Sequence, residues 1–269
     1  MHASHDLRFG VVAGRSPSGR AWAATVRRTE ALGYDLLLVP DTAFTPSPFP
    51  ALAAAAAVTE RLRVGTWVLA APLRTAPAVV RETAALQLLS DGRFELGLGT
   101  GRPGGEHDAR ALGVPWRTPA VRLAQLLEVV EAVRDGVDPA PAVTVAAGRP
   151  KGLAAASRVA DTVALALPHS ATVEQVRDAA GRAREHGTPS LALQLAGVGG
   201  RWVAWLAASA PTSEDAAGAA AFLRGSVEDM AEQLHALSAA TGITTFPVAE
   251  EHAEAFAPVL ALLRGAPTQ

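Results

Sequence analysis

The chain alternates short runs of β-forming residues with longer stretches of helical spacing from one end to the other. We expect eight strands, at residues 7–13, 35–40, 63–69, 94–99, 142–147, 162–167, 190–195 and 244–248. The clearest helical pattern between them is at 119–134, where leucine and valine recur every three or four residues. A strand followed by a helix, repeated along the chain, is typical of a parallel α/β fold.

Several predicted strands are apolar on both faces, as in VGTWVL, FELGLG and TVALAL. Such runs are typical of parallel strands that are buried on both sides. Eight of them fit a closed parallel α/β barrel better than an open doubly wound sheet, which is the alternative. The length of 269 residues agrees with one domain over 1–269, because α/β barrels commonly use about 250 residues.

The amino-acid composition limits the kinds of molecule that this chain is expected to bind. Hydrophobic residues make up 49% of the chain, enough for a core, while a net charge of −2 offers no basic surface for nucleic acid or membrane. The chain has no cysteine, which excludes disulfides, thiolate metal sites and cysteine nucleophiles. Its apolar runs are far shorter than about 18 residues, and because the start MHASHDLR is polar we expect no signal peptide there. We expect a cytoplasmic protein that binds a small molecule.

The carboxyl ends of barrel strands are where an active site is expected. They carry mostly glycine, hydroxyl and basic residues, and Asp41 is the acidic residue directly at such an end. Beside Pro40, Asp41 fits a turn or capping role as well as a functional one. The histidines show no pair at metal-ligand spacing with a carboxylate, so no metal site is expected.

Two glycine-containing segments follow predicted strands. In GLGTGRPGG no helix follows early enough for a dinucleotide fingerprint, but Gly99 and Gly101 around Thr100 indicate a place where backbone approaches a flat ligand. In Gly148-Arg149-Pro150-Lys151 a helix begins, and free N–H groups with basic side chains favour a bound phosphate over a merely solvated turn. Lys151 is the only lysine, and its place at a helix entry argues against Schiff-base chemistry.

The block RVGTWVLAAPLRTAPAVVRETAALQLLSDGRFELGLGTG, with GYDLLLVPD before it and AVTVAAGRPKGLAAASRVADTVAL after it, resembles the bacterial luciferase-like family of flavin- and F420-dependent oxidoreductases. The resemblance covers most of the chain and is densest over 63–101. Because VTVAAGRP is similar to the AAGG-type turn of deazaflavin enzymes, the resemblance is greatest to the F420-dependent branch, with FMN as the alternative cofactor. The carboxyl-terminal part resembles actinobacterial members.

The resemblance implies a TIM barrel with the isoalloxazine or deazaflavin ring in the mouth at the strand ends. It also implies a bulge with a non-prolyl cis peptide beneath the ring, at Thr66, Trp67 and Val68. The remaining cofactor contacts are expected at Thr100, Gly101, Gly148, Arg149, Lys151 and His169. Relatives commonly pair through barrel helices, so a homodimer through 51–58 and 76–90 is expected.

The chain also departs from the family pattern. Relatives often have Asp-His at the end of the second strand, and this chain has Asp41-Thr42. We expect Asp41 and Thr42 to relay a proton or polarise the substrate, with Arg102 and His107 as weaker candidates. The loop insertion between the fourth helix and the fifth strand is shortened to DGVDPAPA, which would open the mouth to a bulky or peptide-like substrate.

The leading hypothesis is a reductase that passes hydride from reduced F420 to an activated C=C, C=N or C=O bond of an organic or peptide-like substrate, in natural-product biosynthesis. An FMN-dependent luciferase-like monooxygenase is the first alternative. A non-catalytic partner subunit of the same fold is the second.

Overall fold

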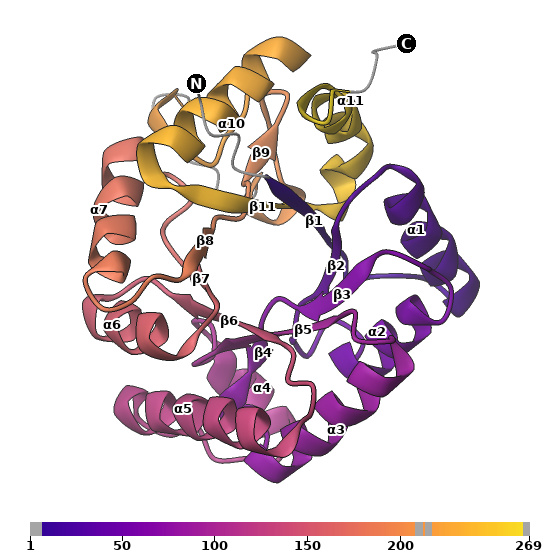
Figure 1. Cartoon of the computed structure of the whole chain (residues 1–269), viewed down its shortest axis with the longest axis vertical. Helices are drawn as coiled ribbons and strands as arrows, with labels where there is room; N and C mark the ends of the chain where they lie inside the picture. Colours follow the sequence, from indigo (N-terminus) through magenta and orange to yellow (C-terminus); the bar gives the residue numbers. More distant parts are fainter. Residues whose placement is uncertain (1–6, 208–211, 213–216, 266–269) are drawn as a thin grey trace.

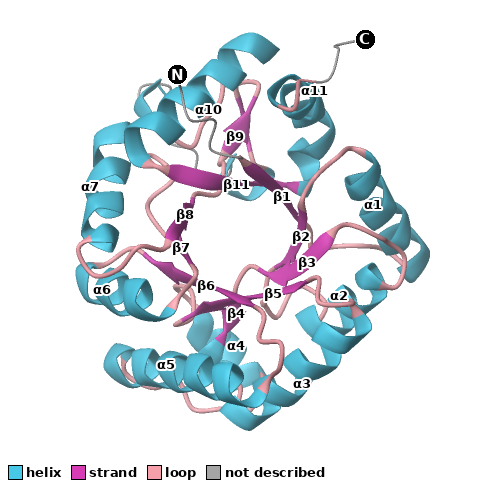
Figure 2. Cartoon of the chain, viewed as in Figure 1, coloured by secondary structure: helices cyan, strands magenta, loops and turns pink. Residues whose placement is uncertain are grey.

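The computed structural model describes residues 7–207, 212 and 217–265. Its main sheet is parallel and has the order β3-β2-β1-β11-β8-β7-β6-β5-β4. Because β3 also pairs with β5, the sheet closes into a ring, seen end-on in Figures 1 and 2. The strands are β1 (Arg8–Val12), β2 (Leu36–Val39), β3 (Arg63–Thr66), β4 (Leu69–Ala70), β5 (Phe94–Gly99), β6 (Ala142–Ala147), β7 (Thr162–Leu165), β8 (Ser190–Ala192) and β11 (Ile243–Ala249).

Helices surround this ring on its outer side (Figure 2). They are α1 (Gly19–Ala31), α2 (Pro48–Ala56), α3 (Ala76–Leu89), α4 (Gly105–Ala111), α5 (Pro119–Gly136), α6 (Pro150–Val159), α7 (Val173–Arg184), α8 (Ala204–Ala207), α10 (Val227–Thr241) and α11 (Ala253–Leu263). Short 3₁₀ turns lie at Ala71–Leu73 and Glu250–His252, and β9 (Gly197–Val198) forms a hairpin with β10 (Arg201–Trp202). The architecture is a TIM barrel, as the sequence predicts.

The predicted strands agree with the observed ones apart from their ends and one interruption. The strand expected at 63–69 is divided into β3 and β4, because the chain between them leaves the ladder at a cis peptide bond from Trp67 to Val68. β3 and β4 occupy a single position in the ring, which therefore has eight positions. Of the predicted domain 1–269, residues 1–6, 208–211, 213–216 and 266–269 lie outside the described part.

Local sequence signals set several helix ends. Thr172 and Ser226 each accept a backbone N–H from the third helical residue, whose side chain accepts the cap's own N–H in return. These two capping boxes satisfy N–H groups that a helix start otherwise leaves without partners. Gly242 ends α10 in the left-handed conformation, with φ of 69°. No side chain caps the start of α6, as is also the case for α2, α3, α4, α5 and α11.

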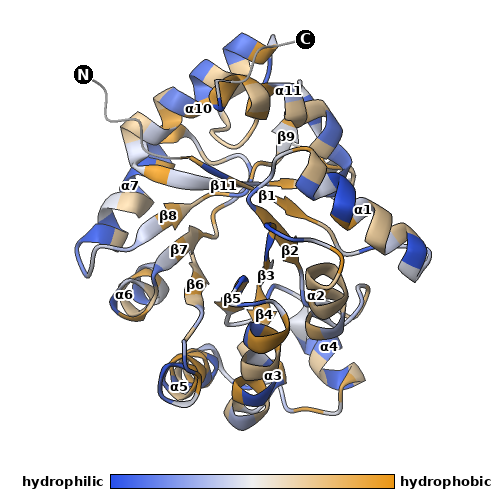
Figure 3. Cartoon of the chain, turned by 45° about the vertical axis from the view of Figure 1, so that its right-hand side comes forward, coloured by the Kyte–Doolittle hydropathy of each residue, from blue (hydrophilic) through white to orange (hydrophobic). Residues whose placement is uncertain are grey.

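The core lies between the strands and the inner faces of the helices. In Figure 3 the barrel strands are mostly hydrophobic, and the hydrophilic residues gather on the helices. At the amino-terminal end of the barrel, Glu95 accepts hydrogen bonds from Arg8, at 2.6 Å, and from Arg63. This charged cluster closes the end of the barrel opposite the strand carboxyl ends, where ligands bind in this architecture.

We predict that Gly97→Ala destabilises the barrel by about 1–3 kcal/mol or more. A Cβ at residue 97 would lie 2.0 Å from the Thr66 carbonyl oxygen, so β3 and β5 would have to separate. The matched control is Gly181→Ala in α7, where a Cβ meets nothing within 4 Å and alanine is expected to stabilise the helix by up to about 1 kcal/mol. Urea unfolding measures both; an unchanged midpoint for Gly97→Ala would contradict the prediction.

Candidate functional site

A cavity of about 1020 Å³ lies at the carboxyl ends of the barrel strands, and we call it the mouth cavity. Its wall comes mainly from the segments that follow β2, β3, β5 and β6, and from the first half of α5. Of the residues expected to act in catalysis or to bind the cofactor, those that line it are Asp41, Thr42, Trp67, Val68, Thr100, Gly101, Gly148, Arg149 and Lys151. Residues from distant parts of the sequence therefore meet in one place.

Asp41, at the end of β2, is held by two partners. Both of its carboxylate oxygens accept hydrogen bonds from the Arg74 guanidinium, one of them at 3.1 Å, and the backbone N–H of Ala70 donates at 3.0 Å. The Asp41 side chain is 9% exposed and that of Arg74 17%. These contacts tie the end of β2 to the segment that follows the cis peptide bond, so they favour a positioning role for Asp41 over proton transfer.

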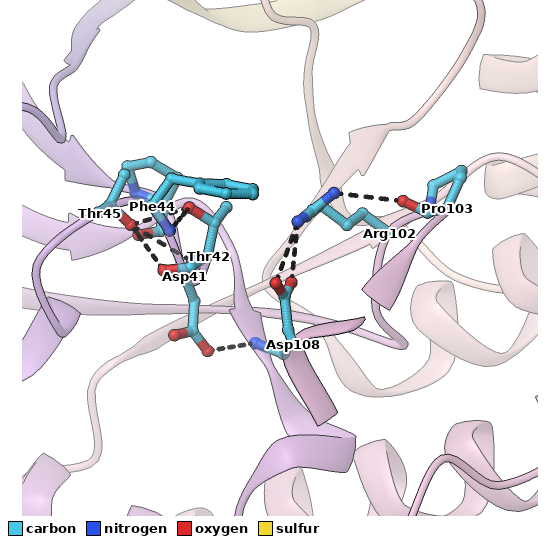
Figure 4. Close-up of polar contacts among 9 residues, drawn as sticks. Asp41, Thr42, Phe44, Thr45, Arg102, Pro103 and Asp108 are labelled. Carbon is cyan, nitrogen blue, oxygen red and sulfur yellow. Dashed lines mark hydrogen bonds and ion pairs between the residues drawn. The ribbon is translucent and has the colours of Figure 1, made fainter. Parts of the chain in front are cut away.

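Thr42 belongs to a chain of hydroxyl groups in the loop after β2 (Figure 4). Its Oγ1 lies 3.1 Å from the Thr45 Oγ1, with either able to donate, and it also accepts the Phe44 backbone N–H at 3.3 Å. The Thr45 hydroxyl lies 3.0 Å from the Pro40 carbonyl oxygen, to which it can donate. A threonine hydroxyl both donates and accepts, so Thr42 retains the capacity for the predicted polarisation or proton relay.

The cis peptide bond joins Trp67 to Val68, within the three residues for which the family resemblance implies it. Thr66 lies below the mouth cavity and is not part of its lining. Its hydroxyl donates to the Gly97 carbonyl oxygen at 2.6 Å and accepts the Gly97 N–H at 2.8 Å. The Trp67 indole N–H donates to the Gln194 side-chain oxygen at 2.8 Å. Thr66 therefore supports the bulge, while Trp67 and Val68 face the cavity.

The glycines at the end of β5 and shortly after it make room for aromatic and branched side chains. A Cβ at Gly99 would lie 2.7 Å from Val68, and a Cβ at Gly101 or Gly105 would lie 2.3 or 2.6 Å from the Trp116 ring. The Trp116 ring also meets the Arg122 guanidinium, 4.1 Å from the ring centre. The flat group against Gly101 is thus an indole of the chain itself, which forms part of the cavity wall.

Arg102 lies at the rim of the mouth cavity between two partners. Its guanidinium donates to both carboxylate oxygens of buried Asp108, at 3.2 and 3.0 Å, and lies 5.9 Å from the centre of the Phe44 ring. Figure 4 shows Phe44 and Arg102 facing each other from the loops after β2 and β5. The other weaker candidate, His107, is in α4 and does not line the cavity.

The basic segment predicted to hold phosphate follows β6. Arg149 and Lys151 line the mouth cavity at the uncapped start of α6. Close packing requires glycine at position 148, because a Cβ there would lie 2.0 Å from the Ala166 carbonyl oxygen. A helix start with unused N–H groups and two basic side chains, opening into a cavity, has the chemistry of an anion site.

His169 does not line the mouth cavity. It is half-buried in the loop after β7, where its ring meets the Trp205 indole edge-on with centroids 5.1 Å apart. Burial lowers the pKa of His169 below its ordinary value and so favours the neutral form of the ring. The predicted contact of His169 with a phosphate stays a prediction.

Three important residues were missed by sequence reasoning: Arg74, Trp116 and Gln194. The closely spaced glycines at 101 and 105 were a usable signal for Trp116, since they permit close approach of a flat group. Arg74 and Gln194 carry no comparable signal, because their partners are 33 and 127 residues away in the sequence.

In the described part of the chain, no three His, Asp or Glu side chains gather to hold a metal ion, and no helix is long and apolar enough to cross a membrane.

The fold and the cavity define a TIM-barrel protein with a large cavity at the carboxyl ends of its strands. A family model described as luciferase-like monooxygenase matches residues 6–259, and the chain belongs to this family.

Among curated relatives, an F420-dependent glucose-6-phosphate dehydrogenase of Intrasporangium calvum is 38% identical over 117 residues, and one of Kribbella flavida is 40% identical over 119. Each match covers 40% of this chain and about a third of the relative, at 35% and 34%.

Solved structures of similar fold cover nearly the whole chain. An F420-dependent secondary alcohol dehydrogenase, in complex with an F420–acetone adduct, has a TM-score of 0.75 at 14% identity and covers 94% of this chain and 99% of its own. The monooxygenase RslO1 from Streptomyces bottropensis has a TM-score of 0.74 at 18% identity and covers 95% and 98%. At such identities the likeness shows the shared fold alone.

We predict that Asp41→Asn lowers the free energy of unfolding by about 3 kcal/mol, because it leaves the Arg74 guanidinium without a charged partner. The double variant Asp41→Asn with Arg74→Met should recover part of this loss. Glu254→Gln, which breaks the exposed Arg28–Glu254 pair, is the control and should change little. Urea unfolding is the measurement, and equal stability of Asp41→Asn and the parent would contradict the positioning role.

Proposed function

We propose that this protein is an oxidoreductase that binds coenzyme F420 in the mouth cavity and reduces an activated double bond of an organic substrate. The observation that carries the proposal is that one large, mostly apolar cavity is lined on one side by the basic start of α6, which no side chain caps. This combination suits a ligand with a flat ring system and an anionic tail.

The residues present fit such a cofactor. Where the strands end, the lining includes three small residues, Gly99, Ala146 and Ala166, which leave space for a ring system. Arg149 and Lys151 can pair with the phosphate of the tail, and the α6 start can donate N–H groups to it. F420 supplies a two-electron hydride donor, which suits reduction of C=C, C=N or C=O bonds.

The chain itself must orient the substrate and supply a proton. We propose the Thr42 hydroxyl for polarisation or proton relay, because it lines the cavity and is linked to Thr45. Asp41 would act through its hold on Ala70 and Arg74. The short link before β6 favours a bulky or peptide-like substrate, and we propose a role in natural-product biosynthesis.

The partial relatives named as F420-dependent dehydrogenases support F420 as the cofactor. The similar fold of the monooxygenase RslO1 supports the second candidate, an FMN-dependent monooxygenase. The two differ in chemistry: deazaflavin lacks the ring nitrogen that supports an oxygen adduct, so the two cofactors give different reactions with oxygen.

The test is titration of the purified protein with F420 and, separately, with FMN, followed by cofactor fluorescence. We expect F420 to bind more tightly than FMN and its reduced form to be stable to oxygen on the protein. Tight FMN binding with oxygen consumption would instead support the monooxygenase. No binding of either cofactor at tens of micromolar would overturn both candidates and support a non-catalytic subunit.

We predict that Arg149→Gln and Lys151→Gln each weaken cofactor binding by about tenfold, since each removes a charged partner of the phosphate. Arg158→Gln is the matched control, because Arg158 lies in the last turn of the same helix and does not line the cavity. The dissociation constants from the same titration decide the matter. If Arg158→Gln weakens binding as much as Lys151→Gln does, the phosphate site lies elsewhere.

We also propose that the protein forms a homodimer through α2 and α3. On α3, Leu88 is 78% exposed and Leu89 62%, and large apolar side chains of this kind are favourable to bury in an interface. Sedimentation analysis of the purified protein gives its mass in solution and tests this proposal.

A further inference from the structure

The hydrogen bond between Trp67 and Gln194 crosses the barrel. In the ring of strands, β3 and β8 are four positions apart in either direction, so they lie opposite each other. Trp67 directly follows β3, and Gln194 lies two residues beyond β8. The 2.8 Å contact between the indole N–H and the Gln194 side-chain oxygen therefore spans the interior of the barrel.

Both ends of this contact are held by backbone hydrogen bonds. The Trp67 N–H donates to the Val39 carbonyl oxygen of β2 at 2.8 Å. On either side of Gln194, the N–H groups of Leu193 and Leu195 donate to Thr245 and Pro247 of β11, at 3.0 and 2.8 Å. The position of the Trp67 side chain is thus fixed relative to two opposite walls of the barrel.

The Trp67 side chain separates two spaces of very different size. Above it is the mouth cavity, and below it is an internal cavity of about 20 Å³ that Trp67 also lines, together with Thr66, Gly97 and Glu95. The lower space holds about one water molecule and is far too small for an indole. A Trp67 side chain that lost its present position would therefore have to move into the mouth cavity.

We propose that Gln194 is a positioning residue that holds the Trp67 indole across the barrel and thereby fixes the depth of the mouth cavity. Without an acceptor, the indole N–H would be left unsatisfied inside the barrel, which costs more than a solvated group. If the indole turned toward the mouth cavity, its N–H could find another hydrogen-bond partner, but the ring would then fill space that the cofactor needs. The effect on cofactor binding rests on the proposed function, whereas the hold on the indole does not.

The test compares Gln194→Leu, which removes the acceptor, with Gln194→Glu, which keeps an acceptor oxygen. The chain has five tryptophans, and the indole N–H resonance of Trp67 in an NMR spectrum is identified by its loss in Trp67→Phe. We expect Gln194→Leu to shift this resonance and to weaken F420 or FMN binding by about tenfold, while Gln194→Glu retains both. In a Trp67→Phe background, Gln194→Leu should weaken binding no further.

An unshifted Trp67 resonance in Gln194→Leu would overturn the proposal, and so would unchanged cofactor binding in that variant. The proposal would also be overturned if Gln194→Leu weakened cofactor binding equally in the parent and in the Trp67→Phe background, because Gln194 would then act by another route. A wild-type protein that binds neither cofactor would overturn the proposed function, whereas the Trp67 resonance would still decide whether Gln194 holds the indole.

Discussion

The barrel depends on the closure between β3 and β5, the last pairing needed to turn the sheet into a ring. Val64 and Gly65 pair with the start of β5, and Leu69 and Ala70 with its end. Between these pairings the chain departs from the ladder at the cis peptide bond, and the Thr66 hydroxyl bonds both the N–H and the carbonyl of Gly97. One side chain thus replaces missing backbone pairing, so the sheet stays closed while Trp67 and Val68 turn toward the ligand site.

Charged side chains are distributed unevenly around the mouth cavity. Among the described residues that line it, the two acidic side chains are each paired with an arginine, Asp41 with Arg74 and buried Asp108 with Arg102. Among the described residues, no carboxylate forms an ion pair with Arg149 or Lys151. The positive charge available to a ligand therefore gathers at the α6 start, where the helix dipole has the same sign. A chain with net charge −2 can in this way offer a local anion site.

Much of this site follows from the sequence because of the topology. Once eight parallel strands are expected, the carboxyl end of each must point to one face, and residues such as Thr42, Thr100 and Gly148 are brought together without any contact being known. The side-chain partners do not follow in the same way. Asp41 illustrates this. The sequence is compatible with a capping role or a catalytic one, whereas in the folded chain the carboxylate is paired with the Arg74 guanidinium.

The sequence by itself determined the repeated strand–helix order, the barrel class, the strand ends that form the mouth and the basic helix start. These depend on local periodicity, turn residues and composition, which are properties of neighbouring positions. The tertiary structure decided where Trp67 lies, what Asp41 binds and which aromatic ring Gly101 accommodates. Those outcomes depend on groups that are far apart in the chain and come within hydrogen-bonding or van der Waals distance only when the ring of strands closes.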